Sequence, residues 1–374
     1  MLVKTEELQN VCQKILNAID NNKLSTLTEM LEIVSENGVL YLNVTNREYY
    51  VQCKIDVQTE ETLHATINAS AFLKLVSQIT TEDITLTVEN NNCLKVFGNG
   101  VYSFPIVFEN DTMLTLPKIL MQNVTSEFNI ETSILNSIAS FNTKQLSLGY
   151  ISKPIQKLYY IDNSGAVTFT TGACINNFHL ANDVKLLLNS KIVKLFKLFM
   201  TDDVTFKIGH YQLSQDIIQT VVEFSNDNVC ITALLAYSDE LYNSIPIDNI
   251  RARANTLFPY AVIFDKSALT QALNRLSIFA SNKSTMNYSI FEFEQDKVTI
   301  YDIHKQNHEE IHYSNENTNI TDKYTLIVDT NELKSCIDMF NDQYVNFRFG
   351  DKQAISISKD NVTYIIPEIQ NNNE

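Results

Sequence analysis

The residues best suited to chemistry lie at positions 308–312, which read H-E-E-I-H. In the H-E-x-x-H pattern of zinc peptidases, the two histidines bind the metal and the glutamate is the general base. That chemistry requires a helix, because residues four apart then lie on one face, about 6 Å apart. In a β-strand the two imidazoles would stand about 13 Å apart and could not share an ion.

The surrounding sequence favours a strand. The stretch "DIHKQNHEEIHYSNENTN" lacks apolar residues at helical spacing, and its Asn, Asp and Ser residues disfavour a helix interior. His304 precedes the motif by four residues, but no third ligand follows at the usual distance. We therefore predict a strand with a solvated face and keep a zinc metallopeptidase as the alternative function.

Other catalytic patterns are absent from the sequence, which contains no G-x-S-x-G, P-loop or G-x-G-x-x-G motif. The adjacent acids Asp202-Asp203 and Glu309-Glu310 are typical of turns and wet strands. We expect a protein that is not an enzyme and has no metal and no cofactor.

Length and composition point to a globular chain of two or three domains, with 374 residues of which 44% are hydrophobic. No apolar run is long enough to cross a membrane, and the first residues lack the layout of a signal peptide. The six cysteines are scattered without a C-x-x-C pair, which favours reduced thiols and a cytoplasmic location.

Charge is unevenly distributed along the chain. The net charge of −16 argues against an outer surface that grips nucleic acid. However, "VKLLLNSKIVKLFKLFM" (184–200) holds four lysines and no acid. This segment predicts a basic helix face, because Lys191, Lys194 and Lys197 are spaced by three and stay on one side of a helix.

A domain-sized repeat organises the chain. Three segments each show an apolar helical pattern, an acidic turn and alternating strands; they are 72–107, 192–224 and 333–368. Each is preceded by another helix and a hairpin with a polar turn, "SENG", "DNSG" or "EQDK". We predict an α+β protein of three domains, at 1–122, 123–254 and 255–374, each built as helix, strands, helix, strands.

Four stretches carry a resemblance to a known family. They are "INASAFLKLVSQITTEDITLTVENNNCLKVFGNGVYSFPIV", "GAVTFTTGACI", "ALNRLSIFASNKSTMNYSIFEFEQDKVTI" and "NVTYIIPEIQ". In this order and spacing they resemble the bacterial replicative sliding clamp, the beta subunit of DNA polymerase III. The sequence departs from the family where "TTGACI" replaces the usual acidic, His and Arg residues and where "QNNNE" extends the tail. It resembles a divergent clamp of a cell, phage or plasmid.

The resemblance implies a DNA sliding clamp, a processivity factor for DNA replication. Two protomers would close head to tail as a homodimer ring around duplex DNA, with helices lining the hole and sheets outside. DNA contacts would be independent of sequence, and a polymerase and clamp loader would bind through short apolar peptides. A clamp-fold scaffold that binds proteins but does not encircle DNA is a second alternative.

The resemblance also assigns residues to three surfaces. The DNA-facing set is Lys14, Lys23, Lys74, Lys153, Lys157, Lys185, Lys191, Lys194, Lys197, Arg275 and Lys334. The partner-peptide pocket is Leu158, Gly172, Ile175, Pro246, Ile250, Tyr364, Ile365, Ile366 and Pro367. The dimer interface joins Tyr102 and Phe104 of the first domain to Ile278 and Phe279 of the third.

Overall fold

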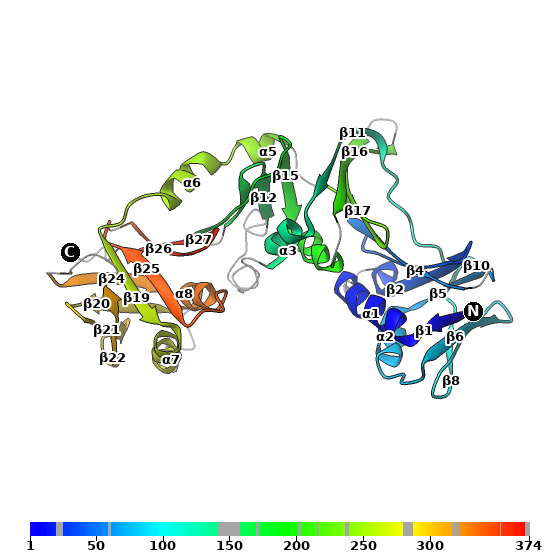
Figure 1. Ribbon diagram of the computed structural model, residues 1–374, viewed down its shortest axis with the longest axis horizontal. Helices are drawn as coiled ribbons and strands as arrows, with labels where there is room; N and C mark the ends of the chain where they lie inside the picture. Colours follow the sequence, from blue (N-terminus) through cyan, green and yellow to red (C-terminus); the bar gives the residue numbers. More distant parts are fainter. Residues whose placement is uncertain are drawn as a thin grey trace. The chain divides into compact units, whose positions relative to one another are not determined.

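The computed structural model divides the chain into two compact units (Figure 1). It describes residues 1–19, 25–58, 61–140, 158–169, 172–200, 203–214, 217–235, 239–279, 287–315, 320, 322–351 and 353–370. The first unit comprises Met1–Ala139 and Lys191–Ser238, and the second comprises Ser140–Ser190 and Asp239–Glu374. Both units contain part of the predicted middle domain, so the boundaries at 122 and 254 stay predictions.

The first unit is built on an antiparallel sheet of eight strands, in the order β11-β16-β17-β18-β4-β3-β2-β5. These strands are β2 (Met30–Glu36), β3 (Val39–Thr45), β4 (Tyr49–Asp56), β5 (Leu63–Asn68), β11 (Gln122–Ile130), β16 (Val204–Ser214), β17 (Ile217–Ser225) and β18 (Val229–Leu234). A second sheet, in the order β1-β6-β7-β8, is formed by β1 (Leu2–Lys4), β6 (Asp83–Glu89), β7 (Cys93–Phe97) and β8 (Val101–Pro105). A short pair consists of β9 (Phe108–Glu109) and β10 (Thr112–Met113).

The helices of this unit are α1 (Thr5–Ile15), η1 (Leu16–Ala18), η2 (Thr26–Glu29), α2 (Ala69–Val76), α3 (Thr132–Ser140), α4 (Ser190–Leu195) and η5 (Phe196–Leu198). Leu27 of η2 packs beside Met30 and Tyr50 on the face of the larger sheet that carries Glu32, whereas most of the other helices pack on its apolar face. Phe196 of η5, for example, packs on Phe224 of β17 with ring centroids 4.6 Å apart. The helix predicted from the lysine-rich segment is confirmed, but it begins at Ser190 rather than at Val184.

The opposite face of the eight-stranded sheet is polar, and its register is continuous. Paired residues form one row from β5 to β11: Thr66, Glu32, Asn43, Gln52, Cys230, Ser225, Thr205 and Asn129. Side chains paired across antiparallel strands point to the same face. The row therefore shows that pairing of β4 with β18 makes one sheet from strands far apart in sequence.

The second unit repeats this plan. Its large sheet has the order β15-β12-β13-β14-β27-β26-β25-β19-β23, formed by β12 (Leu158–Asp162), β13 (Gly165–Phe169), β14 (Ala173–Asn177), β15 (Lys185–Asn189), β19 (Tyr260–Asp265), β23 (Ser314–Asn315), β25 (Tyr344–Phe349), β26 (Ala354–Lys359) and β27 (Val362–Pro367). Its small sheet has the order β22-β21-β20-β24, formed by β20 (Tyr288–Phe293), β21 (Lys297–Asp302), β22 (His308–His312) and β24 (Tyr324–Asp329). The helices are α5 (Asp239–Asn243), α6 (Ile247–Ala254), α7 (Lys266–Ser277) and α8 (Thr330–Ile337).

The predicted order of helix, strands, helix, strands is confirmed along the chain. The three alternating segments of the repeat form β6, β16 and β25. Strand-to-helix junctions are fixed by side-chain caps: Asn68, Asp265 and Asp329 each accept a hydrogen bond from a backbone N–H in the first turn of the next helix.

Asparagine and aspartate form most of the tight turns. Seven of the nine non-glycine residues with positive φ in the described part of the chain are Asn or Asp. Both tolerate the left-handed region better than most residues. The Asn37-Gly38 pair, at φ 53° and 75°, closes the β2–β3 hairpin in the way that a type I′ turn requires. The scarcity of glycine therefore does not prevent hairpins.

Candidate nucleic-acid and partner interfaces

A stripe of lysines runs along α4 and η5. Lys191, Lys194 and Lys197 are exposed, whereas all the residues between them are buried. The stripe is straight partly because η5 is a 3₁₀ helix, with about three residues per turn. Within the described part of the chain, neither Lys194 nor Lys197 forms an ion pair. Their charges are therefore available to an anion.

Two further predicted lysines lie on neighbouring helices. α1 contacts both α2 and η5, and Gln9 of α1 donates to the Val76 and Ile79 carbonyl oxygens, each at 2.8 Å. Lys14 is half-buried in the last turn of α1 and Lys74 is exposed on α2. These lysines and the stripe thus belong to one layer of adjacent helices.

The other lysines predicted to face DNA do not lie on this helix layer or are not described by the structure. Lys23, Lys153 and Lys157 lie outside the described residues. Lys185 was expected in the basic helix, but it begins strand β15, where its Nζ lies 6.0 Å from the centroid of the Tyr242 ring. Lys334 is half-exposed on α8. Whether any of them faces DNA stays a prediction.

The H-E-E-I-H stretch forms strand β22, as predicted, and cannot be a zinc-peptidase helix. His308 and His312 are exposed on one face, where they pair with Tyr301 and Lys297 of β21. Glu309 points to the other face, because neighbouring side chains alternate along a strand. No group of three potential metal ligands occurs among the residues that the structure describes. The peptidase hypothesis for this motif is therefore wrong.

Glu309 is instead held by Arg275 of α7. The guanidinium Nε and Nη2 donate to the two carboxylate oxygens at 2.6 and 2.8 Å. These hydrogen bonds from Arg275 hold the pKa of Glu309 below its usual range. Arg275, a predicted DNA contact, is thus engaged within its own unit.

The predicted pocket residues gather around the junction of β14 and β27. Ala173 pairs with Ile365 and Ile175 with Thr363, and α6 contacts both strands. This places Ile175 and Ile365, which are buried, beside the helix that follows Pro246. Of the other members of the set, Leu158 is buried, Gly172 and Ile250 are half-buried, and Pro246 and Pro367 are exposed.

Tyr364 and Ile366 do not join this group, because alternation along β27 turns them to the opposite face of the sheet. There the Tyr364 ring packs against Phe340, at 5.7 Å between centroids, and β27 contacts α8. Figure 1 shows α6 and α8 on opposite faces of the large sheet in this unit. The sequence prediction of four consecutive pocket residues, 364–367, therefore mixes two faces.

Gly172 marks a close approach of two backbones. A Cβ atom built there would lie 2.0 Å from the Ile365 carbonyl oxygen and 3.1 Å from Pro367 Cδ. The Gly172 N–H donates to the carboxylate of Glu332 at 3.1 Å. Glu332 is buried, with only 1% of its surface exposed. Position 172 therefore has no room for a side chain, and the hydrogen bond to Glu332 holds the backbone just before β14.

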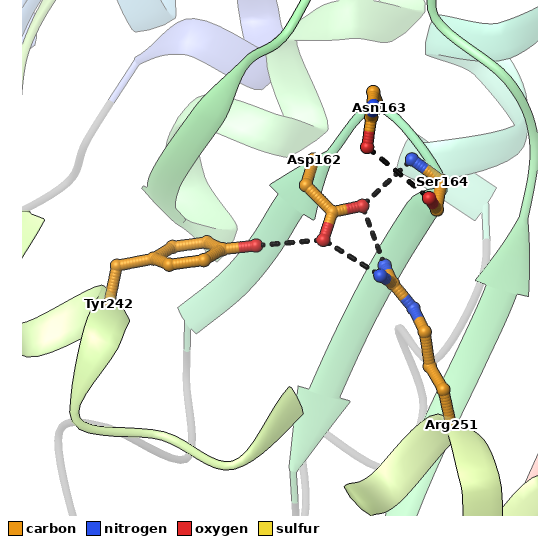
Figure 2. Close-up of polar contacts among 5 residues, drawn as sticks. All are labelled: Asp162, Asn163, Ser164, Tyr242 and Arg251. Atoms are coloured by element: carbon orange, nitrogen blue, oxygen red, sulfur yellow. Dashed lines mark hydrogen bonds and ion pairs between the residues drawn. The ribbon is translucent and has the colours of Figure 1, made fainter. Parts of the chain in front are cut away.

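A polar cluster that the sequence did not reveal fastens α6 to the sheet (Figure 2). Arg251 of α6 donates to Asp162 through Nη1 at 2.7 Å and Nη2 at 2.8 Å. The same carboxylate accepts from Tyr242 Oη at 3.0 Å and from the Ser164 N–H at 2.8 Å. A second ion pair joins Arg253 to Asp351, in the turn between β25 and β26. α6 is thus tethered at both sides of the β14–β27 junction.

These contacts set the protonation of the cluster. Burial tends to raise the pKa of Asp162, but the hydrogen bonds from Arg251, Ser164 and Tyr242 and the Arg251 charge outweigh it, so the pKa is lowered. Burial, followed by the neighbouring Asp162 charge, raises the pKa of the Tyr242 hydroxyl. At neutral pH the cluster is therefore an ionised carboxylate held by a guanidinium and a phenol.

The predicted dimer residues lie at the edge of each small sheet. Tyr102 and Phe104 are half-buried on β8, and Phe104 packs edge-on against Phe72 of α2 at 5.6 Å. Ile278 and Phe279 follow α7 and are 76% and 56% exposed. Exposed apolar side chains of this size are typical of an interaction surface.

Comparison with solved structures identifies the fold. No protein-family model and no curated protein matches the sequence. The beta subunit of DNA polymerase III from Thermotoga maritima matches with a TM-score of 0.75 at 14% identity, over 99% of each chain. That of Borrelia burgdorferi matches with a TM-score of 0.73 at 16% identity, over 99% of this chain and 98% of that one. The sliding clamp of Bartonella birtlesii, bound to griselimycin, matches with a TM-score of 0.76 at 14% identity, over 99% of each chain. The chain therefore has the sliding-clamp fold over its full length.

Gly172→Ala tests the close approach at β14. We expect the free energy of unfolding to fall by about 2 kcal/mol, because the new methyl group displaces a backbone carbonyl. Gly100→Ala is the control, since its Cβ would meet only the end of the Tyr102 side chain, at 3.2 Å. Chemical denaturation measures both, and equal effects would contradict this explanation of Gly172.

Asp162→Ala tests the α6 tether and its pH dependence. We expect a loss of about 2 to 3 kcal/mol in unfolding free energy at pH 7, because Arg251 would be left without its carboxylate. The folded-state pKa of Asp162 lies below the unfolded value of about 3.9. The stabilisation is therefore fully present above that value and is lost as pH falls through the folded pKa. The difference in unfolding free energy between the two proteins should therefore stay constant from pH 7 to about 4 and shrink as pH falls further, and a difference that does not shrink in acid would contradict the assignment.

Proposed function

We propose that this protein is a DNA sliding clamp, a non-enzymatic processivity factor that closes around duplex DNA as a homodimer in the cytoplasm. The lysine stripe of α4 and η5 carries the proposal, because it is a basic surface on a chain with a net charge of −16. Its lysines stand on the helix layer, and the full-length fold is that of clamps.

The lysines of the stripe lie on the helix layer rather than on the polar sheet face, and this arrangement suits a protein that slides along DNA. Lysines that contact only phosphates give no preference for sequence and allow movement along the duplex. The polar face of the eight-stranded sheet carries Glu32, Glu127 and Glu223, and Lys207 lies near the last two at 4.0 and 3.8 Å. The charge of Lys207 is offset by these two carboxylates, so Lys207 attracts DNA less than Lys194 and Lys197 of the stripe do.

The sheet face beside α6 is the proposed site for polymerase and clamp-loader peptides. It combines the exposed Pro367 and the half-buried Ile250, which lie near the buried Ile175 and Ile365, with a helix held by two arginine–carboxylate pairs. A clamp from Bartonella birtlesii has been solved with griselimycin bound, which makes this compound a suitable first probe of the α6 face.

Reversing two lysines of the stripe tests the DNA contact. In Lys194→Glu/Lys197→Glu we expect affinity for linear duplex DNA to fall about tenfold or more, because two attractive charges per protomer become repulsive. The slope of log K against log salt should decrease in magnitude by about 0.9 for each phosphate that the protein no longer neutralises. Fluorescence anisotropy over a salt series measures both quantities.

The matched control is Lys54→Glu/Lys118→Glu, which changes the net charge equally. Lys54 follows Gln52 on the polar sheet face, and Lys118 belongs to the segment that packs there through Leu114 and Leu116. We expect this variant to keep most of the wild-type affinity. Equal losses in both variants would show a general charge effect and contradict the stripe as the DNA contact. Griselimycin binding without any DNA binding would instead favour a protein-binding scaffold.

A further inference from the structure

Glu332 is a buried acid in the first turn of α8. Only 1% of its surface is exposed, and its Oε1 accepts a hydrogen bond from the Gly172 N–H at 3.1 Å, across 160 residues of sequence. We propose that Glu332 is a positioning residue of the partner site, because it holds the Gly172 bend in the conformation that receives a peptide beside α6. The inference rests on the proposed function, and it gives a role in that site to a group that no peptide can touch.

Gly172 lies where the two strands of the partner site meet. It directly precedes β14, whose first residue, Ala173, pairs with Ile365 of β27. The two backbones are in contact here, since a Cβ at position 172 would lie 2.0 Å from the Ile365 carbonyl oxygen. Ile175 and Ile365 lie on these two strands. A shift of the Gly172 backbone would therefore move the apolar residues of the site.

α8 packs on the face of the sheet opposite the partner site. Alternation along β14 turns Cys174 away from Ile175, to the face on which Tyr364 lies and β27 contacts α8. Glu332 thus approaches the bend from the face opposite α6 (Figure 1). Because Glu332 is buried, its carboxylate cannot be a contact for a peptide. Any effect of Glu332 on peptide binding must pass through Gly172.

The start of α8 holds the carboxylate in place. A carboxylate is rarely buried unless hydrogen bonds or charges compensate for its lost hydration. Glu332 is the third residue of α8, where the positive end of the helix dipole favours an acid. The N–H groups of Glu332 and Asn331 donate to the Asp329 side chain at 2.9 and 2.8 Å, which fixes the first turn of the helix. The acceptor that Gly172 meets is therefore part of a rigid element.

The surroundings of Glu332 strengthen its hydrogen bond. Cys336, one turn further along α8, and Cys174 of β14 are both fully buried. Burial, followed by the negative charge of Glu332, raises the pKa of the Cys336 thiol. In an environment of this kind the effective dielectric is low, so a hydrogen bond to a charged group is stronger than at the surface and costs more to lose.

Griselimycin binding, measured by isothermal titration calorimetry, tests the positioning role. We expect Glu332→Ala to weaken binding about tenfold or more, because the Gly172 N–H loses its acceptor and the bend is released. Glu332→Met fills the same space without an oxygen and should weaken binding similarly, even if the smaller alanine destabilises α8. Glu332→Gln should keep most of the wild-type affinity, since its amide oxygen still accepts from the N–H. An equal loss with Glu332→Gln would contradict the hydrogen bond as the cause.

The matched control is Glu292→Ala, which also removes a buried acid of the second unit. Glu292 is 8% exposed and binds Lys305 and Lys323, at 2.6 Å each, on the small sheet. We expect this variant to bind griselimycin as the wild type does. Hydrogen exchange of residues 172–177, followed by mass spectrometry, should become faster in Glu332→Ala and Glu332→Met and stay unchanged in Glu332→Gln and Glu292→Ala.

The outcomes separate this inference from the proposed function. Griselimycin binding that is unchanged in both Glu332→Ala and Glu332→Met, or an equal loss in Glu292→Ala, would overturn the positioning role and leave the partner site in place. A wild-type chain that does not bind griselimycin would contradict the partner site, and this inference with it. DNA affinity should be the same in every Glu332 variant, because the lysine stripe belongs to the first unit.

Discussion

Antiparallel pairing between strands of neighbouring repeats is the interaction on which the rest of the structure depends. β4 with β18 and β14 with β27 turn strands from separate parts of the chain into two continuous sheets. Because paired side chains share a face, each joint also decides which face is apolar and which is polar. A slip of one residue at the β4–β18 joint would turn part of the polar row of the first unit toward its helices.

The joints explain where the candidate sites lie. In the first unit α1 contacts both α2 and η5, so the lysines of α4 and η5 are held on a layer of adjacent helices rather than on loops. At the β14–β27 joint, the backbones come so close that only glycine fits at position 172. α6 contacts both strands of that joint. Arg251 ties α6 to Asp162 at the end of β12, and Arg253 ties it to Asp351 in the turn between β25 and β26. The β14–β27 joint thus also provides a surface where apolar residues lie beside α6, which two ion pairs hold in place.

Local patterns predicted the elements well, because they depend on periodicity. The sequence correctly predicted the alternating segments at β6, β16 and β25 and the strand at 308–312. It also correctly predicted that Lys191, Lys194 and Lys197 lie on one exposed side of a helix. Errors arose where sequence neighbours differ in environment. Lys185 lies several residues before the helix begins, and Tyr364 and Ile366 point away from Ile365 and Pro367.

Long-range polar pairs could not be predicted from one sequence. Arg251 and Asp162 are 89 residues apart, and Glu332 reaches Gly172 across 160 residues. Nothing in either local sequence specifies its partner, because tertiary packing brings them together. In the H-E-E-I-H segment, by contrast, the local sequence suggested a metal site that the structure does not form. The segment is a strand, in which His308 and His312 stand too far apart to bind one ion. Its glutamate, Glu309, binds Arg275 of α7 instead.

Images of single particles in complex with a duplex DNA circle test the central claim most directly. We expect closed rings made of two copies, with DNA passing through a hole lined by helices. Particles that stay as single open chains at micromolar concentration, or that bind DNA only on their outer surface, would contradict it.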